Sequence, residues 1–420
     1  MRKLSFYIFF FTTVVLFGAT QTYEGSVEFV KFKDKKFENK IRDMIGKKEG
    51  ELFKKDLEWI EVLDLNNSDI KSVEGIKYLK GLKKLNLSYN KIESIEEIEK
   101  LDNLEMIDLS GNYISDYTPV RNLNKLREID IIDGNIKEVN FIREGTALES
   151  INFENNKIID IGDIKKCKKL KYLNLWSNEI EKLDGLENLA EIEELYISNN
   201  KIEKIENLKQ IKKLKKLHAA QNKIREISAL SELLQLEELH LNKNQIINVD
   251  ALRNLKNLKE LDISDNFIKD ISPLFGAFLI ENIGIKNNRI ESIAGLGNMY
   301  SLKTADLGMN SIGDITILSE MTHMIHLNFE KNQITDITPI TAMVNLTYLN
   351  ASDNQITDIS PIKNAIGIRY LDISGNNIKS ISTAALFYQL DYMNIKNIKI
   401  AEKEEKYISI VSSYGCKIER

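Results

Sequence analysis

The stretch LHLNKNQI, residues 239–246, recurs along the chain at a fixed spacing. Close variants are LNLSYNKI at 85–92, LNLWSNEI at 173–180, LDISDNFI at 261–268 and LDISGNNI at 371–378. The asparagine in the sixth place of each stretch is separated from the others by a multiple of 22 residues, and we call this place the asparagine slot. Internal repetition means that a length of 420 residues does not imply separate domains, because repeats stack without adding new cores.

The slot continues through fifteen consecutive positions, from Ser68 to Asn376, with no insertion or deletion. Isoleucine stands two residues after every one of them, from Ile70 to Ile378. Gly134 occupies one slot, and a degenerate sixteenth copy has Ile398 in the same place. The other slots all hold asparagine: Asn90, Asn112, Asn156, Asn178, Asn200, Asn222, Asn244, Asn266, Asn288, Asn310, Asn332, Asn354 and Asn376.

Each repeat predicts a short strand, a turn and a return segment. The L-x-L alternation before the slot points two apolar residues inward, and strands of successive repeats are expected to pair in parallel about 4.8 Å apart. The asparagine amide can bond backbone groups that the turn would leave unpaired. Apolar residues spaced by about three in the return segment favour short 3-10 or irregular helical turns.

These features form the leucine-rich repeat pattern. They predict an α/β repeat fold, in which a curved right-handed solenoid has a concave parallel β-sheet and a convex side of short helical turns. The repeats are expected to span residues 62–398, with a C-terminal cap over 399–420.

The N-terminal residues predict a targeting segment and a helical cap. A basic start followed by an apolar run indicates a cleaved signal peptide over residues 1–20, with an uncleaved anchor as the alternative. Residues 21–61 are expected to cap the first repeat, with an amphipathic helix between Asp34 and Gly46 whose apolar face is made of Phe37, Ile41, Met44 and Ile45. The mature chain is predicted to have no membrane span, because no other apolar run is long enough.

Charge and cysteine placement exclude some classes of function. The net charge is −5, with 58 basic and 63 acidic residues intermixed, so the basic footprint of a nucleic-acid binder is absent. Cys167 falls in a row that holds leucine in other repeats, which predicts a buried thiol. Cys416 lies about eleven repeats further on, too far from Cys167 for a disulfide, which needs Cα atoms within about 7 Å.

Four repeats carry a further step of Asp, one residue, Ser or Thr, and Pro. It occurs in NQITDITPI at 332–340, NQITDISPI at 354–362, KDISPL at 269–274 and SDYTPV at 115–120. With the strict 22-residue period, this step resembles the internalins, secreted or surface-bound bacterial proteins that bind host or partner proteins. The resemblance implies a secreted or cell-surface adhesin with a role in virulence, whose partner is another protein such as a host-cell receptor. The same period is also similar to an intracellular subunit that regulates a protein phosphatase. The alternative function is therefore an intracellular or periplasmic scaffold that regulates an enzyme such as a phosphatase.

Two groups of side chains on the predicted concave face are candidates for partner binding. Positions six, four and two residues before each slot should face outward, and the row four before the slot is mostly Asp or Asn. Aromatic and histidine side chains on such a face are typical of binding hot spots, although aromatic residues also suit strands. The central group contains Tyr172, Trp176, Tyr196, His218, His240 and Asp262, and the second group contains His326, Tyr348, Tyr370 and Tyr392.

No catalytic residue, metal or cofactor is predicted. His218 and His240 at strand spacing could share a zinc ion with Glu238, Glu260 or Asp262, but parallel side chains on an open sheet are not expected to converge. Nucleophile elbows and phosphate loops are absent from the sequence. The predicted partner is therefore another protein, bound by a monomer, with glycan stacking on the aromatic rings as a further alternative.

Overall fold

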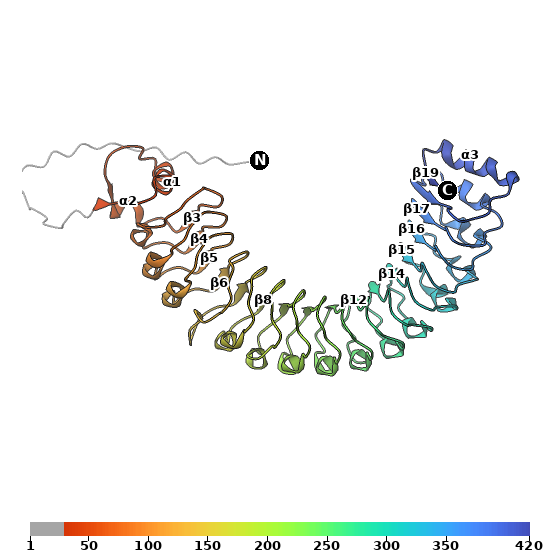
Figure 1. Cartoon of the computed structure of the whole chain (residues 1–420), viewed down its shortest axis with the longest axis horizontal. Coiled ribbons are helices and arrows are strands. Elements are labelled where there is room, and N and C mark those ends of the chain that lie inside the picture. Colours follow the sequence, from red (N-terminus) through yellow and green to blue (C-terminus); the bar gives the residue numbers. More distant parts are fainter. Residues whose placement is uncertain (1–28) are drawn as a thin grey trace, which may run out of the picture.

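The computed structural model describes residues 29–420, which form an open arc of stacked repeats (Figure 1). Each repeat contributes one strand to the inner side of the curve and, in most cases, a 3-10 helix to the outer side (Figure 1). This architecture confirms the predicted leucine-rich repeat solenoid. The predicted signal peptide lies outside the described residues, and within them no helix is long and apolar enough to cross a membrane.

A parallel sheet of seventeen strands lines the concave side of residues 29–420. Successive strands pair with a shift of one repeat, so that Leu217 lies opposite Leu239 and His218 opposite His240. The first strand pairs only with the second and the last only with the one before it, so the described sheet is open at both edges. The strands are β3 (Val62–Asp64), β4 (Lys84–Asn86), β5 (Met106–Asp108), β6 (Glu128–Asp130), β7 (Ser150–Asn152), β8 (Tyr172–Asn174), β9 (Glu194–Tyr196), β10 (Lys216–His218), β11 (Glu238–His240), β12 (Glu260–Asp262), β13 (Asn282–Gly284), β14 (Thr304–Asp306), β15 (His326–Asn328), β16 (Tyr348–Asn350), β17 (Tyr370–Asp372), β18 (Tyr392–Asn394) and β19 (Lys417–Glu419).

Short 3-10 helices form most of the return segments, as the spacing of apolar residues predicts. They are η1 (Ile76–Tyr78), η2 (Glu96–Lys100), η3 (Thr118–Asn122), η4 (Gly162–Lys166), η5 (Leu186–Asn188), η6 (Glu206–Gln210), η7 (Ser228–Glu232), η8 (Asp250–Leu252), η9 (Ser272–Leu274), η10 (Ala294–Leu296), η11 (Thr316–Glu320), η12 (Thr338–Ile340), η13 (Ser360–Asn364), η14 (Ser382–Leu386) and η15 (Glu402–Glu404).

The Asp-x-Ser/Thr-Pro step begins some of these 3-10 helices. The Asp336 carboxylate accepts a hydrogen bond from the backbone N–H of Thr338 at 2.8 Å, and Asp358 does the same for Ser360 at 2.8 Å. Proline follows in the first turn, where its missing N–H costs no hydrogen bond. The step is therefore a helix-start signal repeated at the convex side.

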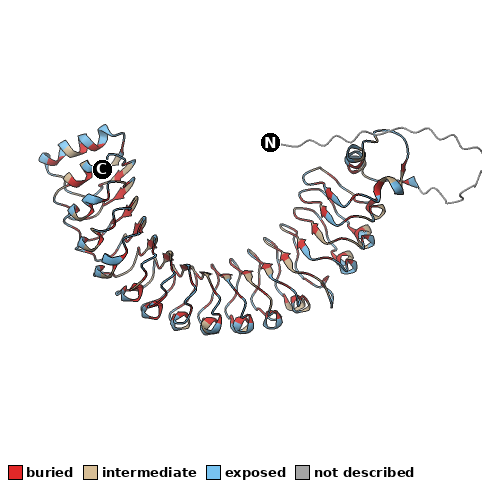
Figure 2. Cartoon of the chain, turned by 180° about the vertical axis from the view of Figure 1, so that it is seen from behind, coloured by how far each residue is buried: buried red, intermediate tan, exposed pale blue. Residues whose placement is uncertain are grey.

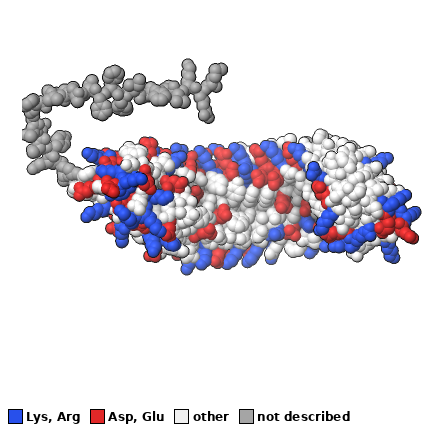
Figure 3. All heavy atoms as spheres, turned by 90° about the horizontal axis from the view of Figure 1, so that it is seen from above, with Lys and Arg blue, Asp and Glu red and all other residues white. Residues whose placement is uncertain are grey.

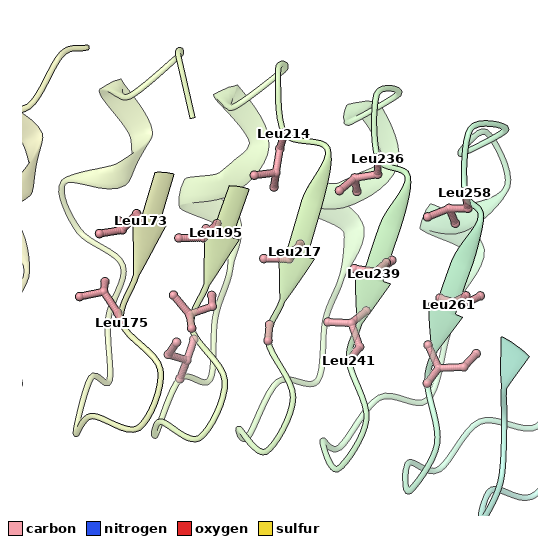
Figure 4. Packing of buried hydrophobic residues seen from close by; sticks show 14 of the residues in the cluster. Leu173, Leu175, Leu195, Leu214, Leu217, Leu236, Leu239, Leu241, Leu258 and Leu261 are labelled. Atoms are coloured by element: carbon pink, nitrogen blue, oxygen red, sulfur yellow. The ribbon is translucent and has the colours of Figure 1, made fainter. Parts of the chain in front are cut away.

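The core runs unbroken along the solenoid between the sheet and the return segments (Figure 2). Leu217, Leu239 and Leu261 point to the same side of their strands and form one row of it (Figure 4). Burying each such side chain stabilises the fold by about 1.5–3 kcal/mol. Cys167 is fully buried in the same core, where burial raises the pKa of its thiol to about 12, and both Cys167 and Cys416 are free.

The asparagine slots form a ladder that joins each turn to the preceding repeat. The Asn222 amide donates to the carbonyls of Ile197, Ala219 and Ala220 at 2.9, 3.2 and 3.2 Å. Its side-chain oxygen accepts from the backbone N–H of Ile202 at 3.0 Å. The same pattern recurs at other slots, which confirms that the amide satisfies buried backbone groups of the turn.

The residue immediately before each slot adopts left-handed backbone geometry, which the sequence analysis missed. Lys243 has φ 57° and Met309 has φ 54°, although neither is a residue that favours this region. The strain costs a non-glycine residue about 1–2 kcal/mol. The side-chain amide of the following slot asparagine makes several buried hydrogen bonds, and these bonds hold the turn in this conformation. The signal was present in the sequence, since this row is rich in Asn, Asp and Gly.

Gly134 replaces asparagine in one slot, and a tyrosine fills the space beside it. The buried Tyr117 hydroxyl donates to the Gly134 carbonyl at 3.2 Å. Tyr117 stands where most repeats carry isoleucine or valine, and burial raises the pKa of its hydroxyl. A Cβ atom on Gly134 would lie 2.8 Å from that hydroxyl, so the glycine leaves the room that the tyrosine fills.

Replacing Tyr117 by phenylalanine is expected to lower the free energy of unfolding by about 1 kcal/mol, because a buried hydrogen bond is lost while the ring stays. Urea denaturation followed by circular dichroism measures the change. Tyr113→Phe is the matched control, because this tyrosine is 69% exposed. Equal stability of the two variants would show that the Tyr117 hydroxyl does not support the Gly134 turn.

The N-terminal segment forms a small unit against the first repeat. Strands β1 (Phe29–Val30) and β2 (Leu52–Phe53) pair antiparallel, and helices α1 (Lys35–Ile45) and α2 (Lys54–Leu57) accompany them. Asp34 caps α1 and Gly46 ends it with φ 69°, as predicted. Phe37 and Ile41 are buried, but Met44, expected on the apolar face, is 41% exposed because only one side of α1 meets the repeats.

The C-terminal segment adds a further strand to the sheet. Helix α3 (Glu405–Ser413) follows the last 3-10 helix, and β19 then pairs in parallel with β18. Glu404 is buried and accepts hydrogen bonds from the Ser380 hydroxyl at 2.7 Å and the Ile381 backbone N–H at 3.0 Å. These contacts fasten the segment to the repeat that carries Ser380.

Candidate functional site

The strands present three rows of side chains on the concave face, six, four and two residues before each slot. The register places Tyr196 of β9, His218 of β10, His240 of β11 and Asp262 of β12 in one continuous row. Tyr172 lies one strand earlier in the row six before the slot, and we call these five residues with Trp176 the central cluster. Their orientation follows from the alternation of the strand, since Leu217 and Ala219 on either side of His218 are buried.

Ring contacts connect most of the central cluster. The ring centroids of Tyr172 and Tyr196 are 5.5 Å apart, and Tyr196 meets His218 edge-to-face at 4.7 Å. His218 stacks on His240 at 4.2 Å with the planes 7° apart. Trp176 is 41% exposed and makes no ring contact with the others among the described residues. The Tyr and His side chains face outward as expected, but their contacts with one another leave them half-buried.

Charged side chains of the neighbouring row surround the two histidines. His218 Nε2 lies 2.6 Å from Glu238 Oε1, and His240 Nε2 lies 3.0 Å from Glu260 Oε1. Lys216 Nζ lies 3.6 Å from the Glu194 carboxylate and 3.9 Å from that of Glu238. Burial lowers the pKa of His218, as does the neighbouring His240, while Glu238 opposes this shift.

The ligand atoms of His218, Glu238 and His240 all lie within 4.8 Å of one another. The expectation that side chains on the open sheet would not converge is therefore wrong for this trio. Convergence arises because His218 leans across to Glu238 in the adjacent row of the next strand, and this carboxylate also lies 3.6 Å from His240 Nε2. These three residues are the group within the described chain that could hold a metal ion.

The second predicted group is a continuous stack of rings, which we call the C-terminal ladder: His326, Tyr348, Tyr370 and Tyr392. Consecutive ring centroids are 3.8, 4.3 and 4.8 Å apart, and the planes differ by 5, 8 and 12°. Lys417 Nζ lies 5.4 Å from the centroid of the last ring. Each inner ring therefore has both faces covered by its neighbours and presents an edge to solvent. Burial raises the pKa of the Tyr392 hydroxyl to about 12, and also raises that of Tyr370.

A polar network next to the C-terminal ladder was missed by the sequence analysis. Lys286 Nζ lies 2.6 Å from Glu330 Oε1, a contact that spans two repeats. The second Glu330 oxygen accepts from the Asn350 amide at 2.7 Å. The repeat between Lys286 and Glu330 carries Gly308 in the same row, where a Cβ atom would lie 3.0 Å from the Glu330 side chain. The signal that could have revealed this network is a lysine and a glutamate in the same row, 44 residues or two repeats apart.

Acidic and basic residues alternate along the row seven before the slot, at one long edge of the solenoid (Figure 3). Lys215 lies 2.7 Å from Glu193, and Lys259 lies 2.6 Å from Glu237. We call this row the charged rim: Glu61, Lys83, Glu105, Arg127, Glu149, Lys171, Glu193, Lys215, Glu237, Lys259, Glu281 and Lys303. It neutralises its own charge, so it exerts no strong field of one sign.

The charged rim is interrupted beside the start of the C-terminal ladder and resumes with the Arg369–Asp391 ion pair at 3.5 Å. The next two positions in the row are Ile325, which is 43% exposed, and Thr347. Uncharged side chains prevail towards this end of the molecule (Figure 3). Because the break coincides with the start of the stacked rings, the concave surface here is less charged than in the first half of the solenoid.

Comparison with known proteins agrees with the fold. The sequence matches the family described as leucine-rich repeats in two copies over residues 146–188, 191–232, 235–276, 322–364 and 344–386, and the leucine-rich repeat family over 60–114. Together the matches cover more than half of the chain. No curated protein gives a significant match.

Solved structures with a similar solenoid include two internalins from Listeria monocytogenes. InlF is 24% identical, with 88% of this chain and 96% of that chain covered and a TM-score of 0.58. InlJ is 21% identical, with 91% and 78% covered and a TM-score of 0.71. The Arabidopsis receptor kinase HAESA ectodomain, solved with a peptide hormone ligand, is 17% identical, with 78% and 64% covered and a TM-score of 0.62. The chain therefore belongs to the leucine-rich repeat family, and its fold is that of the internalins.

Proposed function

We propose that this protein is a non-enzymatic binding protein, secreted or held at the cell surface, which recognises another protein through its concave face. The observation that carries the proposal is the change of the outward rows from small Asp and Asn to aromatic and histidine side chains in the central cluster and the C-terminal ladder. Such side chains supply much binding energy at protein interfaces. The internalin fold favours the adhesin role, and the HAESA ectodomain with its peptide ligand is a precedent for binding by such a solenoid.

The stacking in the C-terminal ladder favours a protein partner over a glycan. A sugar stacks on the open face of an aromatic ring, but the faces of Tyr348 and Tyr370 are covered by neighbouring rings. Their exposed edges carry hydroxyl groups, which suit hydrogen bonds to a peptide backbone or to polar side chains. A glycan array tests the alternative directly, since specific glycan binding would contradict a partner of protein chemistry.

The extracytoplasmic location rests on the predicted signal peptide and on the family's usual location. We expect protein recovered from the culture medium or the cell surface to begin near residue 20, as measured by N-terminal sequencing. Recovery of the whole chain, with residues 1–20 intact, from the cytoplasm alone would instead support the scaffold that regulates an enzyme.

Simultaneous replacement of Trp176, Tyr196 and His218 by alanine is expected to weaken binding of the partner by about 100-fold or more, because clustered hot-spot residues each cost about 2 kcal/mol or more. The partner is first identified by affinity capture with the intact protein, and the dissociation constants are then compared by surface plasmon resonance. All three positions face outward from the sheet, so the variant should remain folded.

A matched control replaces three exposed apolar residues on the return segments, Leu234, Phe278 and Tyr388, which are 51, 53 and 56% exposed. This variant should bind with unchanged affinity. Unchanged affinity of the Trp176, Tyr196 and His218 variant, or equal loss in both, would reject the central cluster as the binding surface. A second concave variant, Tyr348→Ala with Tyr370→Ala, distinguishes the C-terminal ladder from the central cluster.

A further inference from the structure

Two imidazole nitrogens and a carboxylate converge at the centre of the concave face. Glu238 Oε1 lies 2.6 Å from His218 Nε2 and 3.6 Å from His240 Nε2. From this geometry we infer that His218, Glu238 and His240 form a binding site for a divalent transition-metal ion of the zinc class. Two histidines with one carboxylate are a ligand set that zinc uses in proteins.

The two distances from Glu238 to the histidines are near those of an ion's ligands, and the histidine rings must turn to share the ion. Ligand atoms that surround a tetrahedral zinc ion at 2.0–2.1 Å lie about 3.3 Å from one another. The separation of 3.6 Å between His240 Nε2 and Glu238 Oε1 is already close to this value, and the 2.6 Å separation at His218 must widen by less than 1 Å. His218 and His240 stack with their planes only 7° apart, so both rings must also rotate about their side-chain torsions before their Nε2 lone pairs point at one ion. The strands β10 and β11 stay paired through their backbones during this rotation.

The surroundings favour a cation. Glu260 Oε1 is 3.0 Å from His240 Nε2, and Asp262 lies opposite His240 in the register. Lys216 Nζ lies 3.9 Å from the Glu238 carboxylate, and it is shared with the Glu194 carboxylate at 3.6 Å.

The site keeps one side open. The side chains of His218, Glu238 and His240 are each about a quarter exposed, at 25, 25 and 24%. Three protein ligands on an exposed face leave a fourth position for water or for a group of a docked molecule. The metal site goes beyond protein binding by the concave face, and the ion can be tested without any partner.

Titration of Zn²⁺ into the metal-free intact protein, followed by isothermal calorimetry near pH 7.5, is expected to show one ion per chain with a dissociation constant on the order of a micromolar or tighter. His240→Ala and Glu238→Gln should each weaken this binding by about 10- to 100-fold. His326→Ala is the matched control, because this half-buried histidine belongs to the C-terminal ladder and should leave the affinity unchanged.

Substitution of Co²⁺ provides a spectroscopic readout of the ligand set. Bands of a tetrahedral cobalt complex should appear in the visible spectrum of the unaltered protein and disappear in His240→Ala. Circular dichroism of the variants establishes that they remain folded. Absence of saturable Zn²⁺ binding, or equal affinity of the unaltered protein, His240→Ala and Glu238→Gln, would overturn the assignment and leave only hydrogen-bonded Glu–His pairs and an adventitious ion.

Discussion

Replacing Asn222 by alanine is expected to lower the free energy of unfolding by about 3 kcal/mol. The amide bonds three carbonyls and one backbone N–H, and it is buried, with 9% of its surface exposed. Alanine would leave those groups without a partner in a place that water reaches poorly. It would also release the left-handed turn at Gln221, which has φ 55°.

Urea denaturation followed by far-UV circular dichroism measures this loss. Asn207→Ala is the matched control, because the Asn207 amide makes an exposed bond to Glu187 and holds no turn. The control should change stability by less than about 0.5 kcal/mol. A similar small change in Asn222→Ala would mean that the asparagine ladder contributes little to the fold.

Replacing Phe329 by alanine is expected to lower the free energy of unfolding by about 3–5 kcal/mol. The ring is fully buried in a row that holds leucine or isoleucine in most repeats. The next residue in that row is Ala351, so the large ring fills space beside a small neighbour. Truncation would open a cavity that the two adjacent repeats cannot close without moving the sheet.

Phe329→Leu is the control for this prediction, because leucine already suits the row and should cost less than about 1.5 kcal/mol. Since each repeat contacts only its neighbours, hydrogen exchange should speed up around β15 and β16 and stay unchanged near β4 in Phe329→Ala. Uniform loss of protection along the whole solenoid would contradict such local coupling.

Much of the fold could be predicted from the sequence because the pattern is local and repeated. The slot, the isoleucine two residues later and the L-x-L alternation define the strand, the turn and the buried rows of each repeat. The repeat pattern also predicted that Cys167, which stands in a row of leucines, is buried, and it is. The repeat pattern did not predict the C-terminal strand β19. The helix α3 separates it from the repeats, and Lys417–Glu419 is not part of an L-x-L stretch with an asparagine slot.

The candidate site could be predicted only in part. The rows identified which aromatic and histidine residues share the concave face, and the register confirms that His218 lies beside His240. The repeat pattern could not reveal that neighbouring rings stack and so cover one another's faces. Nor did it separate the exposed Trp176 from the half-buried Tyr196, because exposure depends on the size of neighbours in two rows at once.

The sequence by itself determined the period, the core rows and the asparagine ladder, because every repeat meets a neighbour built to the same pattern. Only the tertiary structure decided which outward side chains touch. His218 contacts Glu238, which is 20 residues further along the chain. This contact runs diagonally between two rows, whereas the repeat pattern describes only neighbours 22 residues apart in one row. Such diagonal contacts depend on side-chain rotamers and on the approach of adjacent strands, so they arise only once the sheet has formed.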